Sequence, residues 1–437
     1  MLLKRSAMVL VLGIAALAQT PPYAQVGAQA SPRIANLRKQ VELGDPGAVG
    51  HFWQEVHKGG APIVESDLSD PRCSLLTFLW EGDPSTRNVV IFDGVAGFDA
   101  KDRMTAIDST NVWYKTYRVR NDARFAYNLS PNDNLEPFDS IKDNDAMERR
   151  LAAFRLDPLN TRRCPATFGA LSAEASYVEL PNATPRPWKA TTAGTPKGKV
   201  EAATLQSAIL KNDHKLWVYT PYGYSTAAVP YPLLVLFDGD RNVKWIPAIL
   251  DSLIADRKIP PLVAALVVNP TAATRNIELP CYPPFADFLA TELTPWMREH
   301  YHATADPART VAAGSSYGGL AAVFAGLRYP GTFGNVLSLS GSFFWKPEAE
   351  AEPEWLAKQV TAAPQLPVRF YLEVGAMEGY PLQIDGNRHM RDTLRAKGNS
   401  VGYAEYNGGH SFLNWSVGTA TGLLFLLGNG GGVGRSR

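Results

Sequence analysis

The fold of this chain is decided by the stretch Val311-Ala-Ala-Gly314-Ser-Ser316-Tyr-Gly318-Gly-Leu320. An apolar run reads as the end of a buried strand, a Gly-x-Ser-x-Gly motif follows, and an amphipathic segment continues to Arg328. Strand, sharp turn and helix in this order are the context of a nucleophile elbow, which presents a serine hydroxyl at a strained bend. The motif alone is weak evidence in a chain with 36 glycines, so a glycine-rich turn that caps an ordinary helix is the alternative.

Strand and helix patterns alternate on both sides of this stretch. They predict a catalytic domain over residues 200–427, with a mostly parallel sheet covered by helices, as in an α/β-hydrolase. The first half is different, because residues 73–80, 88–92 and 111–119 read as short strands separated by turns. After a helical or irregular lead-in at 32–41 and with strands from His51 onward, residues 31–183 are predicted to form a smaller all-β, immunoglobulin-like sandwich. A proline-rich linker at 184–199 and a flexible tail at 428–437 complete the division.

Composition narrows the functional classes. A chain of 437 residues is longer than a single hydrophobic core usually supports, which suggests two domains. A net charge of +1 gives no basis for binding nucleic acid or an acidic membrane surface. Without Cys-x-x-Cys or His-x-x-x-His spacing we expect no metal site, and we expect no cofactor. Of the three cysteines, Cys73 and Cys164 are the preferred disulfide pair, and Cys281 is left over.

The N-terminus has the pattern of an export signal. Lys4 and Arg5 precede an apolar run over residues 7–18, and small-residue cleavage sites follow. Residues 1–30 are therefore predicted to be a cleaved signal peptide, and the mature protein to be periplasmic or secreted without an integral membrane segment. A retained membrane anchor is the alternative.

The serine needs a base and an acid, which in this fold follow it in the order serine, acid, histidine. His410 lies in the loop Asn407-Gly-Gly-His410 after the last predicted strand and is the expected base. Glu378, just past the preceding strand, is the expected acid. Asp385, Glu373 and a serine–histidine pair without an acid remain alternatives.

The developing oxyanion needs two backbone donors. The N–H of Tyr317, next after the nucleophile, is one. The second is expected from Gly239 or Asp240, in the loop that follows the strand at 231–237.

Several segments resemble one family. Residues 275–280, 285–288 and 292–296 before the elbow, and 333–345 after it, look like those of enterochelin (enterobactin) esterases of the Fes type, in the esterase D-like branch of α/β-hydrolases. Softer similarities extend through 76–80, 111–113, 157–160 and 180–181 to the family's N-terminal sandwich.

The resemblance implies hydrolysis of the ester bonds of a catecholate trilactone siderophore, with iron present only as part of the substrate. A trianionic, aromatic substrate favours cations and aromatic rings around the serine. The predicted binding residues, all placed after strand ends, are Arg275, Arg241, Lys244, Trp345, Lys346 and Arg388. The alternatives are an exported feruloyl or acetyl-xylan esterase and a non-catalytic protein that binds siderophore or glycan.

Overall fold

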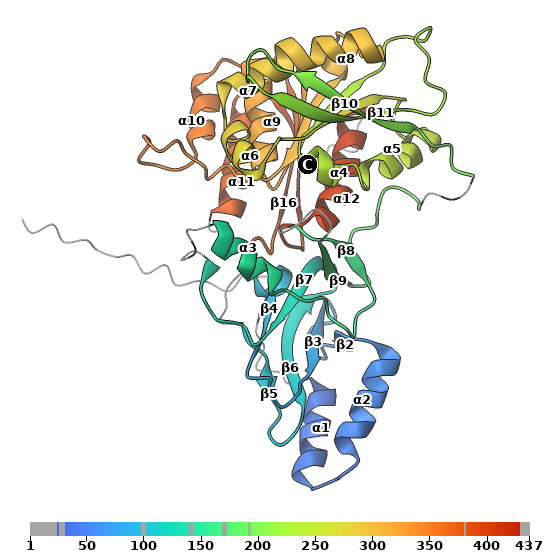
Figure 1. The fold of residues 1–437 in the computed structure, drawn as a ribbon, viewed down its shortest axis with the longest axis vertical. Coiled ribbons are helices and arrows are strands. Elements are labelled where there is room, and N and C mark those ends of the chain that lie inside the picture. The colour runs from blue at the N-terminus through green and yellow to red at the C-terminus, as the bar shows by residue number, and fades with distance from the viewer. Residues whose placement is uncertain are drawn as a thin grey trace, which may run out of the picture.

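The computed structural model describes residues 24–25, 31–97, 102–138, 141, 144–167, 173–190, 192, 194–379 and 382–428. The chain forms two stacked parts, the N-terminal one below the C-terminal one in Figure 1. The predicted signal peptide lies outside the described residues except for Ala24–Gln25, and so does the predicted tail beyond Gly428. Among the described residues, no helix is long and apolar enough to cross a membrane.

The N-terminal part contains two antiparallel sheets, as the strand spacing predicted. One sheet has the order β1-β6-β3-β2 with β5 on β6, and the other has the order β4-β7-β9-β8. Phe78 packs edge-to-face on Tyr117 and on Tyr127, so aromatic side chains fill the core between the sheets. The strands are β1 (Ala24–Gln25), β2 (Ile63–Ser66), β3 (Cys73–Glu81), β4 (Val89–Phe92), β5 (Thr105–Ala106), β6 (Val112–Arg120), β7 (Arg124–Pro131), β8 (Arg163–Pro165) and β9 (Glu174–Glu179).

Helices also occur in the N-terminal part: α1 (Pro32–Glu42), α2 (Ala48–Gly59) and α3 (Asn144–Ala152). The expectation of strands from His51 onward is therefore wrong for α2. Phe52, Trp53 and Val56 are buried on one face of this helix and pack with α1 against the first sheet. Their spacing of one and four residues is a helical stripe, but it is short enough to be mistaken for strand alternation.

The C-terminal part is built on one eight-stranded sheet of order β10-β11-β13-β12-β14-β15-β16-β17. The β10–β11 and β11–β13 pairs are antiparallel and all the others are parallel, which confirms the predicted mostly parallel sheet. The strands are β10 (Lys199–Gln206), β11 (Asp213–Thr220), β12 (Leu233–Leu236), β13 (Val263–Val267), β14 (Thr310–Ser315), β15 (Asn335–Leu339), β16 (Arg369–Gly375) and β17 (Ser400–Tyr406).

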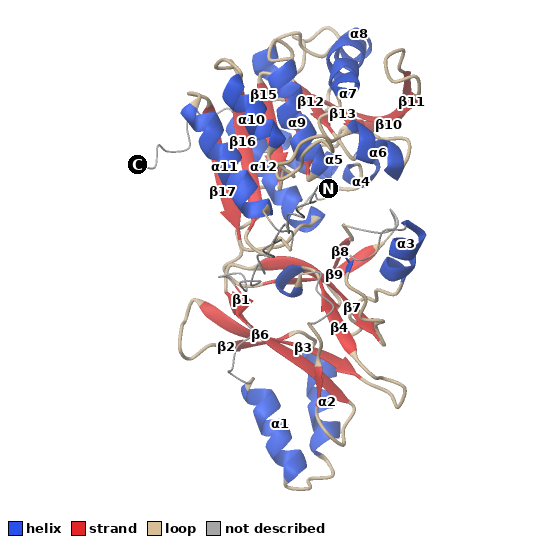
Figure 2. Cartoon of the chain, turned by 90° about the vertical axis from the view of Figure 1, so that its left-hand side faces the viewer, coloured by secondary structure: helices blue, strands red, loops and turns tan. Residues whose placement is uncertain are grey.

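Helices cover both faces of this sheet (Figure 2). One apolar cluster joins one face to α7, α8, α9, α10 and α11, and a second joins the other face to α5 and α12. A π-helical turn at Leu289–Leu293 connects α7 to α8. The helices are α4 (Gly239–Asn242), α5 (Ile246–Ala255), α6 (Ala272–Glu278), α7 (Pro283–Phe288), α8 (Thr294–Tyr301), α9 (Tyr317–Arg328), α10 (Trp355–Ala362), α11 (Gln383–Ala396) and α12 (Phe412–Leu427).

The predicted disulfide is wrong, because Cys73, Cys164 and Cys281 are all free and buried. Cys73 begins β3 in the first sheet, whereas Cys164 lies in β8 of the other sheet. The two thiols therefore belong to different layers of the sandwich, and a bridge requires their Cα atoms to lie within about 7 Å of each other.

Candidate active site

Ser316 lies at the bend between β14 and α9. Its backbone adopts φ 57° and ψ −123°, a conformation that non-glycine residues rarely adopt. The bend is tight because a Cβ on Gly314 would lie 2.5 Å from the carbonyl carbon of Gly318. The Gly-x-Ser-x-Gly spacing is thus a packing requirement that leaves Ser316 at the end of the central parallel strands.

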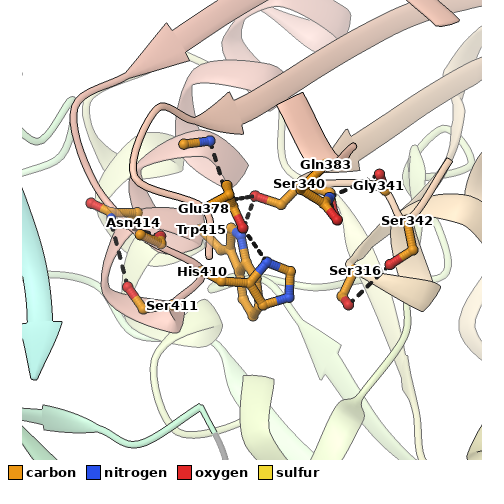
Figure 3. Close-up of polar contacts among 12 residues, drawn as sticks. Ser316, Ser340, Gly341, Ser342, Glu378, Gln383, His410, Ser411, Asn414 and Trp415 are labelled. Atoms are coloured by element: carbon orange, nitrogen blue, oxygen red, sulfur yellow. Dashed lines mark hydrogen bonds and ion pairs between the residues drawn. The ribbon is translucent and has the colours of Figure 1, made fainter. Parts of the chain in front are cut away.

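His410 and Glu378 come from neighbouring loops of the same sheet edge. Glu378 follows β16 and His410 follows β17, and both side chains are buried. Nδ1 of His410 makes a hydrogen bond with Oε2 of Glu378. Figure 3 shows the imidazole between the Glu378 carboxylate and Ser316. The structure therefore brings together the three residues that the sequence predicted as nucleophile, base and acid.

Further contacts fix the Glu378 carboxylate. Its Oε1 accepts the hydroxyl hydrogen of Ser340 at 2.6 Å and the N–H of Gly375 at 3.2 Å. The indole Nε1 of Trp415 donates to the Ser340 hydroxyl at 3.0 Å. Ser340 and Trp415 were not among the residues predicted from the sequence. Their positions in the sequence could have indicated them, since Ser340 directly follows β15, the strand next to the elbow strand, and Trp415 lies in the first turn of α12, which begins just after His410.

The other acid candidates lie elsewhere. Asp385 is in α11 with a side chain that is 75% exposed, and its carboxylate lies 3.5 Å from Arg388. Glu373 is inside β16, where it accepts the hydroxyl hydrogen of Tyr371 at 2.9 Å. Burial raises the pKa of Glu373 to about 7 despite that hydrogen bond. Glu378 is the carboxylate that contacts the imidazole.

The predicted oxyanion donors lie on both sides of the elbow. Tyr317 opens α9, where the first N–H groups have no carbonyl partner within the helix. Gly239 opens α4 after β12, at a point where a Cβ would lie 2.4 Å from the carbonyl oxygen of Leu266. The side chain of Asp240 turns toward β11 and accepts from Lys215 and Trp217, so only its backbone could serve. The candidate oxyanion donors are therefore backbone N–H groups at the starts of α4 and α9.

Ser342 is a polar neighbour of the elbow that the sequence analysis missed. Its hydroxyl lies 3.3 Å from that of Ser316, and its backbone N–H donates to the carbonyl oxygen of Ser316 at 3.2 Å. It follows β15 within the same loop as Ser340, which the run Ser338 to Ser342 in the sequence could have signalled.

Two of the predicted substrate-binding arginines surround the loop after β12. Arg275, in α6, donates to both carboxylate oxygens of Asp238, at 2.5 and 2.9 Å. Burial raises the pKa of the Tyr317 phenol, and the positive charge of Arg275 opposes that rise, so the two side chains share one electrostatic environment. Arg241 donates to the carbonyl oxygen of Ala166 at 3.2 Å and thereby bridges the two parts of the chain.

The remaining predicted binding residues are dispersed. Arg388 makes a bidentate ion pair with Glu405, both bonds at 2.7 Å, on the exposed side of α11. Trp345 packs edge-to-face on Trp355. Lys346 donates to backbone carbonyl oxygens of its own loop, and Lys244 lines a cavity of about 310 Å³ between β8, α5 and α12.

Comparisons with known proteins match both parts of the chain to known families. The Esterase family model matches residues 207–426, and the model for the enterochelin esterase N-terminal domain matches residues 75–189. An iron(III) enterobactin esterase of Dickeya dadantii is 30% identical, over 92% of this chain and 97% of that protein. An iron(III) salmochelin esterase of Escherichia coli is 28% identical, over 90% and 98%.

A solved structure extends the similarity to three dimensions. The ferric enterobactin esterase of Salmonella typhimurium superposes with a TM-score of 0.72 at 26% identity, covering 86% of this chain and 98% of that one. Both the sandwich and the hydrolase sheet take part in a match of that extent. The chain therefore belongs to the enterochelin esterase family and is an ester hydrolase of the α/β-hydrolase fold.

Proposed function

We propose that this enzyme hydrolyses the ester bonds of a ferric catecholate trilactone of the enterobactin type and so aids the release of its iron. One observation supports the proposal above all. The Ser316–His410–Glu378 arrangement occurs in a chain that aligns over nearly its whole length with enterobactin and salmochelin esterases. Iron enters only as part of the substrate.

The geometry supports an acyl-transfer mechanism. His410 removes the proton from the Ser316 hydroxyl as the oxygen attacks a lactone carbonyl, and Glu378 stabilises the imidazolium that results. Backbone N–H groups of Tyr317 and of the α4 start stabilise the oxyanion. His410 then protonates the leaving serine alkoxide of the substrate, and water releases the acyl group by the same steps in reverse.

Substrate recognition requires compensation of negative charge. A ferric tris-catecholate carries three negative charges on aromatic rings. Cations at the entrance of the site therefore lower the free-energy cost of desolvating this substrate. Arg275 is the predicted residue best placed for this role, because it adjoins the elbow through Tyr317 and its side chain is 28% exposed. The carboxylate of Asp238 holds the guanidinium in place while part of it still faces solvent.

The test is incubation of the purified protein with ferric enterobactin, followed by chromatography. We expect linear trimer, dimer or monomer of dihydroxybenzoyl-serine. Ser316→Ala and His410→Ala should produce none of these, whereas His300→Ala, which changes an exposed histidine of α8, should match the wild type. Intact macrocycle after prolonged incubation, together with cleavage of a feruloylated sugar, would end the siderophore proposal in favour of the carbohydrate esterase.

A further inference from the structure

The loop that carries His410 is held by the N-terminal domain. The backbone N–H of Arg124, at the start of β7, donates to the carbonyl oxygen of Asn407 at 2.9 Å. The side-chain amide of Asn407 donates in turn to Asp122 at 2.9 Å. Asp122 lies in the turn between β6 and β7 and Arg124 begins β7, so this connection between the two sheets holds the loop three residues before the histidine.

Two glycines allow the loop to approach the sandwich this closely. A Cβ on Gly408 would lie 2.3 Å from the carbonyl oxygen of Arg124, and one on Gly409 would lie 3.2 Å from Oδ1 of Asp93. The two glycines before His410 therefore do not serve only to make the loop flexible. It lets two segments of the N-terminal domain lie directly against the backbone next to the imidazole.

Asp93 has the most unusual backbone conformation among the residues next to this loop. It follows β4 with φ 73° and ψ 173°, a backbone conformation that glycine normally adopts. Its Oδ1 accepts the N–H of Gly94 at 2.7 Å, and its own N–H donates to the carbonyl oxygen of Gly97 at 2.6 Å. A strained residue that is fixed in this way at a functional loop is a reason to look for a role beyond folding.

The loop that carries the acid is anchored in the same domain. Met377, next to Glu378, is 3% exposed and belongs to the sandwich core that contains Phe78 and Phe125. Its N–H donates to the carbonyl oxygen of Gly408 at 2.9 Å, which ties the acid loop to the histidine loop. Both catalytic loops therefore take their positions from the sandwich.

Among the described residues, four titratable groups interact electrostatically with Asp93. His410 and Glu378 act on its charge from the two catalytic loops, and Asp93 acts on Tyr406 in β17 and on Cys164 in β8. Burial raises the pKa of Asp93 to about 7, with Glu378 adding to the rise and His410 opposing it.

We propose that the N-terminal domain is a component of the catalytic site, in which Asp93 is a positioning residue whose fixed carboxylate lies beside Gly409 and limits where the His410 loop can lie. The inference rests on the proposed function in one respect, because it takes His410 as the base. It assigns the sandwich a part in the chemical step itself, separate from any part in holding substrate.

The test uses p-nitrophenyl acetate, which is too small to need the sandwich for binding. Asp93→Gly relieves the backbone conformation and removes the carboxylate. We expect kcat to fall about tenfold, KM to stay within about twofold, and Tm to be no lower than that of the wild type. A residue with only a structural role would lose Tm together with kcat. Asp108→Asn, at an exposed site of the same domain, is the control and should change nothing.

Two further variants separate shape from charge. Asp93→Asn keeps the side-chain volume and the acceptor for the Gly94 N–H, so we expect its kcat to stay within about twofold of the wild-type value. Gly409→Ala places a methyl group against the Asp93 carboxylate and should also lower kcat.

The inference is overturned if Asp93→Gly leaves kcat within about twofold of the wild type, or if Asp93→Asn loses as much kcat as Asp93→Gly does. If kcat fell in Gly409→Ala but not in the Asp93 variants, the loop would be held by the other contacts and Asp93 would have no positioning role. Failure of the proposed function looks different, because ferric enterobactin would then stay intact while the wild type still turned over p-nitrophenyl acetate and lost that activity in Asp93→Gly.

Discussion

Ser340 donates its hydroxyl hydrogen to Oε1 of Glu378 at 2.6 Å, while Oε2 of the same carboxylate contacts the imidazole of His410. The N–H of Gly375 reinforces the Ser340 side. A carboxylate held at one oxygen presents the other in a fixed direction, which selects the tautomer of the histidine that leaves Nε2 free to accept a proton. Ser340 thus connects the loop after β15 to Glu378, the predicted acid.

Replacing Glu378 by glutamine should separate the acid candidates. The amide keeps the volume but cannot stabilise an imidazolium, and its NH2 group favours the wrong tautomer of His410. We expect kcat for a p-nitrophenyl ester to fall roughly 10³–10⁴-fold with little change in KM. Asp385→Asn removes the exposed alternative and should leave kcat within about twofold. A large loss in Asp385→Asn with activity kept in Glu378→Gln would reverse the assignment.

Ser340→Ala should weaken catalysis and folding together. It removes one hydrogen bond to Glu378 and leaves the buried indole N–H of Trp415 without its acceptor. We expect kcat to fall about tenfold and the free energy of unfolding to fall by about 1–3 kcal/mol. The double variant Ser340→Ala/Trp415→Phe no longer buries an orphaned indole N–H. Its stability should recover in part while its kcat stays low, as chemical denaturation and steady-state kinetics would show.

The elbow and its partners could be predicted because they are local patterns or follow from strand order. Ser316 has glycines at fixed offsets on both sides, and Glu378 and His410 follow strands whose ends must meet at one edge of a parallel sheet. The α/β sheet could be predicted for the same reason, since uninterrupted apolar runs such as residues 233–236 fit strands buried on both faces.

What the sequence did not reveal depends on contacts across the fold. Asp93 and His410 are more than 300 positions apart in the chain, and the register that brings them together is set by packing between domains. A helical or irregular lead-in was expected where α1 lies, but the short apolar stripe of α2 hid that helix. The cysteine pairing failed because nothing local shows which sheet a strand joins. Arg388 was placed at the site from its position after a strand, whereas Glu405 holds it on the outer side of α11.

The cysteines provide a direct check on the sandwich. Because Cys73 and Cys164 lie in different sheets as thiols, Tm should be the same with and without a reductant. Burial raises the pKa of Cys164 to about 12, so its reaction with a thiol reagent should be slow in the folded protein and fast after unfolding. A reductant-dependent fall in Tm of several degrees, or an intact mass two protons short of the reduced chain, would contradict this arrangement.

The buried Glu373 should make stability depend on pH. Its pKa in the folded protein is raised from 4.5 to about 7, with burial as the cause. Below about pH 4.5 both the folded and the unfolded chain hold the proton, and no penalty arises. Between about pH 4.5 and pH 7 the unfolded chain ionises while the folded protein keeps the proton, so the free energy of unfolding falls over this window and levels off once the folded protein also ionises.

Glu373→Gln removes this titration while keeping an acceptor for the Tyr371 hydroxyl. Relative to the wild type, the free energy of unfolding of the variant should increase by about 2 kcal/mol between pH 5 and pH 8, measured by denaturant titration at each pH. Glu299→Gln, at an exposed position of α8, is the matched control and should show no such difference. A constant difference between wild type and Glu373→Gln across this range would mean that Glu373 is ionised in the folded protein throughout, and that the sheet beneath the active site tolerates its charge.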